Sequence, residues 1–122
     1  MREAEDLAPK FGYSPGMEAR FARVALDLQN SGISLSRLAP GFRQPFGHKH
    51  ERQEEVYVLA SDNARAKIGD DIVELKAWDA VRVSPETMRA FEAGPEGAEI
   101  VIFGAPSTEN DDASGSMNWW TD

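Results

Sequence analysis

Residues 40–59 of this 122-residue chain read PGFRQPFGHKHERQEEVYVL. The only two histidines of the sequence, His48 and His50, stand two apart in this stretch. In a β-strand, residues i and i+2 point to the same face, so both imidazoles can be directed at one point. Glu55 follows at the start of a run of apolar and β-branched residues. Two imidazoles and one carboxylate form a donor set suited to Fe(II), Mn(II), Ni(II) or Zn(II).

The spacing of these residues leaves a second interpretation open, in which the histidines are solvated side chains that bind nothing. Glu55 can join the site only if it points inward, and strand alternation then directs Tyr57 and Leu59 inward as well. We expect this inward orientation.

The same stretch resembles the first motif of the cupin family. That motif reads Gly, five residues, His-x-His, three or four residues, Glu, six residues, Gly. His48, His50 and Glu55 match its three ligand positions. Two positions depart from it, since six residues separate Gly41 from His48 and Asp62 stands at the final glycine.

Residues 78–93 resemble the second cupin motif in their apolar pattern only. That motif reads Gly, five residues, Pro, x, Gly, two residues, His, three residues, Asn. Trp78, Ser84 and Glu86 stand where Gly, Pro and Gly are expected, and Arg89 stands at the last histidine ligand. A guanidinium stays protonated and cannot ligate a metal.

Arg89 therefore has three open roles. It could pair with Glu55 and replace the metal, or it could hold a substrate anion against a metal bound by the other three ligands. It could also lean out of the barrel. Arg89 and Tyr57 are the candidate catalytic residues, although Tyr57 suits the barrel core equally well.

The resemblance covers about residues 30–105 and implies a double-stranded β-helix barrel of the cupin or jelly-roll type, with a pocket at its mouth and a homodimeric assembly. We expect one cupin domain over residues 1–122. An N-terminal arm would take residues 1–18, the barrel residues 19–105 and a C-terminal tail residues 106–122. The cupin fold hosts many reactions, so it does not specify one.

The pattern along the rest of the chain predicts the same all-β class. Short runs of β-branched and apolar residues alternate with turn residues, as in sandwiches and barrels. No segment has sustained helical periodicity, and the arm is not expected to be helical. Nine strands are predicted, at Arg20–Leu26, Ile33–Leu38, Phe46–His50, Glu55–Ala60, Ala64–Ile68, Ile72–Leu75, Ala80–Val83, Arg89–Ala93 and Glu99–Phe103.

The tail ends in Trp119 and Trp120, which we expect to pack on the barrel or on a second subunit. The rest of the tail is polar and is expected to extend outside the barrel.

The composition of the chain argues against several classes of binding partner. A net charge of −8 argues against nucleic acid and against an anionic membrane surface. The absence of cysteine excludes thiolate sites, and together with an acidic N-terminal stretch that does not read as a signal peptide it favours a cytoplasmic protein. No glycine-rich cofactor loop is present, so no organic cofactor is expected.

The sequence thus predicts a small cupin that binds a divalent transition metal through His48, His50 and Glu55 and acts on a small anionic organic molecule. The alternative is a metal-free cupin that binds or senses a small ligand, with Arg89 in place of the metal. A third possibility is an interaction module that dimerises through its arm and its tryptophan tail.

Overall fold

A computed structural model of the chain describes residues 1–107 and 112–122. The described residues form one short helix and eight strands. In chain order these are α1 (Ala8–Phe11), β1 (Met17–Phe21), β2 (Gly32–Leu38), β3 (Phe46–His50), β4 (Glu54–Ile68), β5 (Asp71–Lys76), β6 (Ala80–Val83), β7 (Arg89–Ala105) and β8 (Ala113–Met117).

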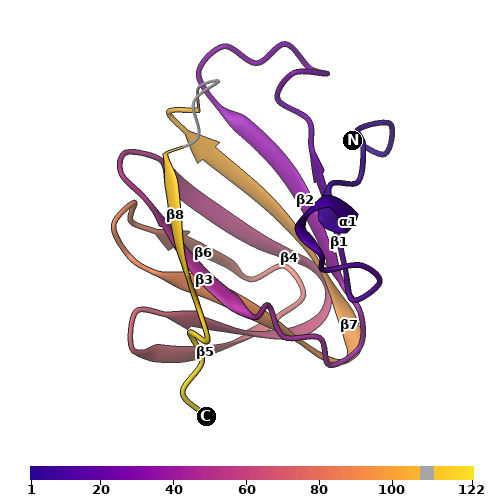
Figure 1. Cartoon of the computed structure of the whole chain (residues 1–122), viewed down its shortest axis with the longest axis vertical. Helices are drawn as coiled ribbons and strands as arrows, with labels where there is room; N and C mark the ends of the chain where they lie inside the picture. The colour runs from indigo at the N-terminus through magenta and orange to yellow at the C-terminus, as the bar shows by residue number, and fades with distance from the viewer. Residues whose placement is uncertain (108–111) are drawn as a thin grey trace.

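The strands form a curled antiparallel sheet (Figure 1). Along one path the order is β1-β2-β7-β3-β8, and β4 joins through pairs with β5, β6 and β7. The two longest strands, β4 and β7, pair from Glu54↔Ala105 to Ile68↔Arg89. Their register shifts between Leu59 and Ser61 and again between Asp62 and Ala64. Such shifts bend a strand pair, so both strands can follow the curvature of the sheet. The all-β prediction is confirmed.

Two predicted breaks between strands were wrong for this reason. The turn residues around Asp62 and around Gly94 do not end strands but lie within β4 and β7. Asp62 adopts a positive φ of 65° at the bend. Turn-type residues therefore mark the bends of two continuous strands, because pairing with the partner strand persists on both sides of each bend.

The core is built by the alternation that strands impose. Along β4, Glu55, Tyr57 and Leu59 are buried while their neighbours are more exposed, which confirms the predicted inward face. Phe91 and Ile100 of β7 are buried in the same core. Burying a large apolar side chain contributes about 1.5–3 kcal/mol.

The N-terminal arm contains one helical turn, contrary to the prediction that it would not be helical. Pro9 lies in the first turn of α1, where a missing N–H costs nothing. Gly12 ends the turn with a left-handed φ of 82°. Pro9 and Gly12 thus mark the start and the end of α1.

The C-terminal tail does not extend outside the barrel, contrary to the prediction. Residues 113–117 form β8, which pairs with β3 from Phe46↔Met117 to His50↔Ala113 and lies beside it in Figure 1. Trp120 donates from Nε1 to the backbone oxygen of Gln44 at 2.8 Å, so the predicted packing on the barrel is confirmed. Residues 108–111 of the predicted tail lie outside the described residues.

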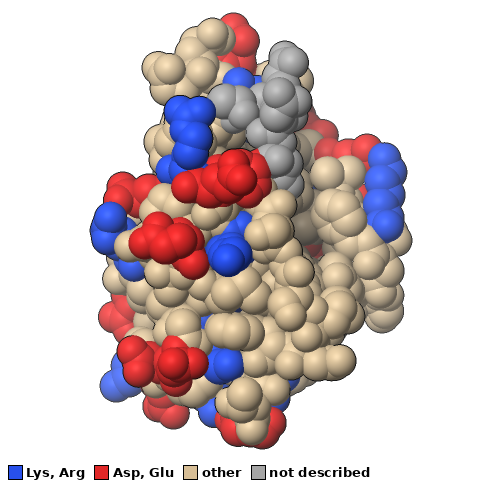
Figure 2. All heavy atoms as spheres, turned by 60° about the vertical axis from the view of Figure 1, so that its left-hand side comes forward, with Lys and Arg blue, Asp and Glu red and all other residues tan. Residues whose placement is uncertain are grey.

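The surface carries charges of both signs. On the face in Figure 2, acidic and basic side chains lie interspersed among uncharged ones. No helix in the described part of the chain is long and apolar enough to cross a membrane.

Candidate metal centre

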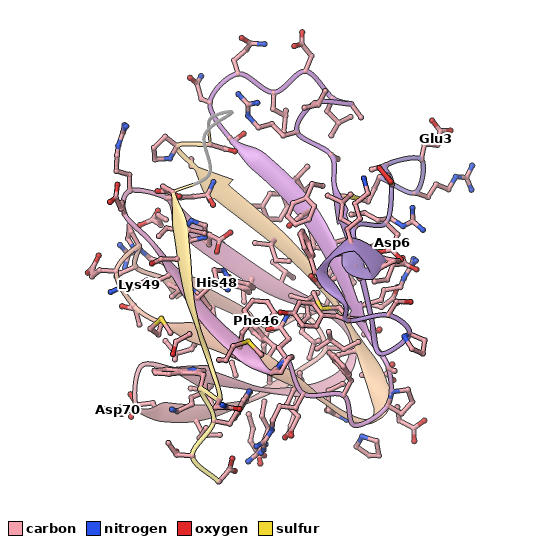
Figure 3. The ribbon with its side chains drawn as sticks, in the orientation of Figure 1. Glu3, Asp6, Phe46, His48, Lys49 and Asp70 are labelled. Atoms are coloured by element: carbon pink, nitrogen blue, oxygen red, sulfur yellow. The ribbon has the colours of Figure 1, made fainter. Side chains whose placement is uncertain are left out.

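The structure brings the three predicted ligands together. His48 and His50 lie on β3, and Glu55 lies near the start of β4. His50 Nε2 is 3.2 Å and His48 Nε2 is 3.6 Å from the same atom, Glu55 Oε1. One ligand atom from each residue lies within 4.8 Å of the others. His48 and Phe46, labelled in Figure 3, both line the interior cavity described below.

These separations fit a metal ion. Ligands about 2.0–2.2 Å from an ion stand about 3–3.5 Å from one another in octahedral or tetrahedral arrangements. The two measured His–Glu distances are close to this range, so an ion could be held with small side-chain movements. The chemistry of the donors agrees, because two imidazoles and a carboxylate suit a first-row transition metal.

Glu55 is held in its charged form. Burial by itself would raise the pKa of Glu55, but hydrogen bonds from His48, His50 and Tyr57 outweigh it and lower the pKa far below its usual 4.5. The Tyr57 hydroxyl donates to Oε1 at 2.6 Å. Burial and the charge of Glu55 together raise the pKa of Tyr57 well above 10.0, so its proton stays in this bond.

His50 is held between two carboxylates. Its Nδ1 lies 2.7 Å from Asp112 Oδ1, opposite the Nε2 that faces Glu55. Burial would lower the pKa of His50, but the hydrogen bonds to Glu55 and Asp112 outweigh it and raise the pKa above 6.5. Asp112 also accepts from the backbone N–H groups of Arg52 and Gln53. Although its partial burial acts in the opposite direction, these bonds and His50 lower the pKa of Asp112 to about 2.

Arg89 lies next to Glu55 inside the protein. Its side chain is 0% exposed, so it does not lean out of the barrel. Nη1 is 3.8 Å from Glu55 Oε1, and Nη2 donates to the backbone oxygen of Ser84 at 2.9 Å. Within the described residues, Nε and Nη1 have no hydrogen-bond partner. The guanidinium therefore acts on Glu55 by charge rather than by a hydrogen bond.

A cavity of about 1160 Å³ opens onto the site. His48, His50, Glu55 and Tyr57 line it, and Arg89 is not among its lining residues. Its walls are rich in aromatic and aliphatic side chains, including Phe11, Tyr13, Phe21, Phe46, Phe91 and Ile100. Its size is that of a small-molecule site.

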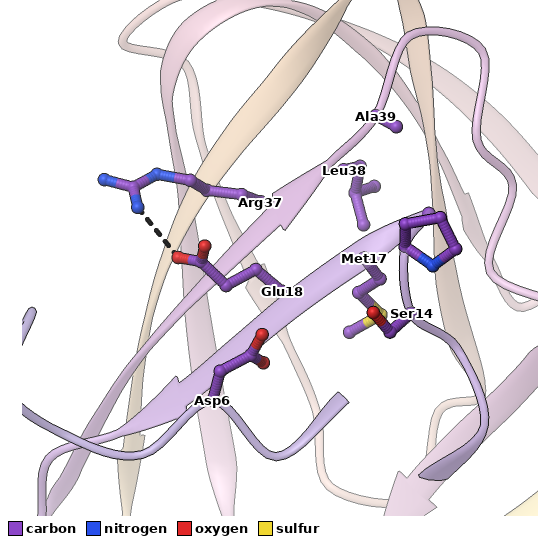
Figure 4. Close-up of a pocket in the computed structure, with 9 residues that line it drawn as sticks. Asp6, Ser14, Met17, Glu18, Arg37, Leu38 and Ala39 are labelled. Atoms are coloured by element: carbon purple, nitrogen blue, oxygen red, sulfur yellow. Dashed lines mark hydrogen bonds and ion pairs between the residues drawn. The ribbon is translucent and has the colours of Figure 1, made fainter. Parts of the chain in front are cut away.

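A smaller pocket of about 310 Å³ lies beside β1 and β2 (Figure 4). Its charged groups already have partners, since Glu18 pairs with Arg37 at 2.7 Å and Asp6 accepts from the backbone of Ala8 and Ala19. These internal pairs give this pocket a structural role.

Asp112 is the site residue that sequence reasoning missed. It lies 62 positions from His50, in the polar tail and outside both motifs. Only the pairing of β8 with β3 brings it to the imidazole. No local motif carries that signal.

Comparison with solved structures identifies the architecture. A cupin protein from Bacteroides fragilis matches with a TM-score of 0.69 at 22% identity, over 85% of this chain and 87% of that one. This chain has the cupin fold. The Streptomyces protein PAC13, solved with uridine, matches at a TM-score of 0.72 and 17% identity over 96% of this chain and 88% of that one.

Oxalate decarboxylase from Bacillus subtilis shares the fold over part of its length. A variant of it matches at a TM-score of 0.76 and 20% identity. The match covers 95% of this chain and 30% of the decarboxylase. No protein-family model and no curated protein matches the sequence.

Proposed function

We propose that this cupin holds a divalent transition metal through His48, His50 and Glu55 and acts on a small anionic organic molecule in the adjoining cavity. The observation that carries the proposal is the convergence of both histidine Nε2 atoms on Glu55 Oε1, at 3.2 and 3.6 Å. Two acceptor atoms at this distance repel each other, and a cation between them would remove that repulsion.

The side chains of the site have separate tasks in this proposal. His48 and His50 present their Nε2 lone pairs, and Glu55 supplies the negative charge. Tyr57 holds the Glu55 carboxylate through its hydroxyl. A bound metal would supply Lewis-acid chemistry to a substrate oxygen. The aromatic walls of the cavity, such as Phe46 and Phe91, would keep water away from that oxygen.

Arginines on the cavity wall supply attraction for an anion. Arg23 and Arg52 both line the cavity. Nε of Arg23 is buried and has no hydrogen-bond partner in the described part of the chain, so it is free to donate to a ligand. Among the fold neighbours, one acts on oxalate and one is solved with uridine, and both compounds are small polar organic molecules.

The second candidate is a metal-free cupin that binds or senses a small ligand. Arg89 favours it, because a fixed positive charge 3.8 Å from Glu55 Oε1 already balances the carboxylate. The same charge would repel a metal ion and weaken its binding. The two candidates differ in one measurable quantity, the metal content of the protein.

Elemental analysis of untagged protein, before and after dialysis against a chelator, tests the proposal. We expect about one transition metal ion per chain, lost on His48→Ala and retained on Lys49→Ala. Lys49 is an exposed residue of the same strand and is therefore a matched control. Absence of metal after loading with Fe(II), Mn(II), Ni(II) and Zn(II) would refute metal binding. Thermal stabilisation by small carboxylates in that apo protein would then support the second candidate.

A further inference from the structure

Asp112 holds His50 from the side opposite Glu55. Its Oδ1 lies 2.7 Å from His50 Nδ1, and its Oδ2 accepts from the backbone N–H groups of Arg52 and Gln53 at 2.8 and 3.1 Å. Both carboxylate oxygens are therefore used. The aspartate is fixed by the turn between β3 and β4, and it fixes the imidazole in turn.

This contact determines which ring nitrogen is available. Both carboxylates beside His50 can only accept, and neutral His50 has a single N–H. The contact to Asp112, at 2.7 Å, is shorter than the 3.2 Å contact to Glu55, so we expect the proton on Nδ1. Nε2 then carries the lone pair and faces Glu55 Oε1 at 3.2 Å. A histidine ligand whose other nitrogen donates to a carboxylate is fixed in tautomer and in ring orientation.

The segment from Asp112 to Asp122, here named the C-terminal strap, brings the aspartate to this position. Its first half, β8, pairs with β3 along the whole of that strand. Its second half is anchored by the two tryptophans. Lys67 Nζ lies 3.7 Å above the Trp119 ring and donates to the Trp119 backbone oxygen at 2.9 Å. Arg43 lies 4.4 Å above the Trp120 ring and also pairs with Asp122 at 3.0 Å.

We propose that Asp112 is a positioning residue, which the C-terminal strap holds against His50 so that Nε2 is unprotonated and directed at the metal position. The strap is thus part of the site and not a covering of the barrel. The metal-binding consequence rests on the proposed function, whereas the tautomer of His50 does not.

Two readouts on the full-length protein test the inference. The first is metal-free: long-range ¹⁵N–¹H spectra in alkaline buffer, which favours neutral His50, report which of its ring nitrogens carries the proton. We expect Nδ1–H for His50 in the native protein. In Asp112→Ala the one carboxylate partner left to His50 among the described residues is Glu55, so we expect the proton to move to Nε2. Asp112→Asn keeps one acceptor oxygen where His50 and the backbone N–H groups now use two, so we expect only part of the Nδ1–H form to remain.

The second readout is the Kd for Zn(II), measured by competition with a chromophoric chelator. We expect Asp112→Ala to raise this Kd about 10–100-fold, the usual cost of losing such a partner. Asp112→Asn should raise it less, because one of the two acceptor oxygens is kept. Asp70→Asn is the matched control, because Asp70 lies at the exposed turn between β4 and β5, away from His48 (Figure 3). Its Kd should equal that of the native protein.

The possible outcomes separate the two proposals. Nδ1–H in the native protein with no Zn(II) binding would contradict the proposed metal function but support the positioning role of Asp112. An Nε2–H tautomer in the native protein, or the same tautomer in Asp112→Ala as in the native protein, would overturn the positioning role. An unchanged Kd in a folded Asp112→Ala would overturn its link to metal binding. If Asp112→Ala does not fold, an unchanged Kd in Asp112→Asn would overturn that link instead.

Discussion

Arg89 faces Glu55 across 3.8 Å without a hydrogen bond between them. Nη2 of Arg89 is used by the Ser84 carbonyl, while Glu55 takes its short hydrogen bond from Tyr57. The pair therefore combines a fully buried cation with a largely buried carboxylate that remains open to the histidines. A metal ion at the site would have to share Glu55 with this guanidinium.

Replacing Arg89 should change metal affinity in a known direction. Arg89→His removes the positive charge and adds an imidazole at the motif's ligand position, so we expect the Kd for Zn(II) to fall by about tenfold or more, a gain of about 1.4 kcal/mol per tenfold step. The metal-free variant should unfold more easily by about 3 kcal/mol, because Glu55 loses its buried counter-charge.

Chelator competition and urea unfolding measure these two effects. Arg82→His is the control, since Arg82 is exposed and contacts Glu54 and the Ser84 hydroxyl rather than Glu55. An unchanged Kd in folded Arg89→His would mean that residue 89 does not reach the metal position.

Tyr57 should stabilise the protein through Glu55. Tyr57→Phe removes a 2.6 Å hydrogen bond to a buried charge. We expect a loss of about 1.5–3 kcal/mol in the free energy of unfolding, as is typical for hydrogen bonds to charged groups. The pKa of Glu55 should rise, because one of the bonds that lower it is gone.

Urea unfolding at neutral pH measures the loss, and ¹³C spectra of the carboxyl carbon follow the pKa. Tyr13→Phe removes a hydroxyl from the same cavity but not from Glu55, so it serves as the control. Equal stabilities of the two variants would show that the Tyr57 hydroxyl contributes nothing through Glu55.

Glu92 should contribute to the free energy of unfolding at neutral pH, and this contribution should be lost at acidic pH. Partial burial alone would raise the pKa of Glu92, but hydrogen bonds from Arg43 and Arg65 outweigh it and lower the pKa below 4.5. A lowered folded-state pKa stabilises the protein fully above the unfolded value, and this contribution disappears as the pH falls through the folded pKa.

We therefore expect Glu92→Gln to cost about 1 kcal/mol at neutral pH and progressively less as the pH falls below 4.5. Unfolding in urea at neutral pH and at about pH 3 measures the difference. Glu96→Gln, at an exposed position of the same strand, should differ from the native protein by the same small amount of stability at both pH values. A constant gap between Glu92→Gln and the native protein at both pH values would contradict the role of the ion pairs.

Gly47 should be required for docking of the C-terminal strap. A Cβ at this position would lie 2.5 Å from Cγ of Trp119, too close for any real contact. Gly47→Ala must displace the indole, and overpacking of this kind costs about 1–3 kcal/mol. We expect a red shift of tryptophan fluorescence, because Trp119 becomes more exposed to water.

The Kd for Zn(II) should also rise in Gly47→Ala if the strap holds Asp112 in place. Lys49→Ala, on an outward-facing position of β3, is the control for both measurements. Native fluorescence in Gly47→Ala would show that Trp119 does not depend on this glycine.

Much of the fold follows from local pattern. The alternation in Glu55–Leu59 predicts which side chains point inward, because strand geometry permits only two faces. The His-x-His spacing places both imidazoles on one face for the same reason. The ends of strands were harder to predict from the sequence. Asp62 and Gly94 are typical turn residues, but here they lie at bends within paired strands. The predicted homodimer, the cytoplasmic location and the catalytic roles of Arg89 and Tyr57 stay predictions.

The sequence by itself determined the all-β class and the three candidate ligands, because both depend on residues that are neighbours in the chain. Only the tertiary structure decided what surrounds them. It placed Arg89 beside Glu55 through the pairing of β3 and β7 at His48↔Arg89. It brought Asp112 to His50 by adding β8 to the sheet. Contacts between residues tens of positions apart are set by strand register, and a single sequence does not encode that register in any local pattern.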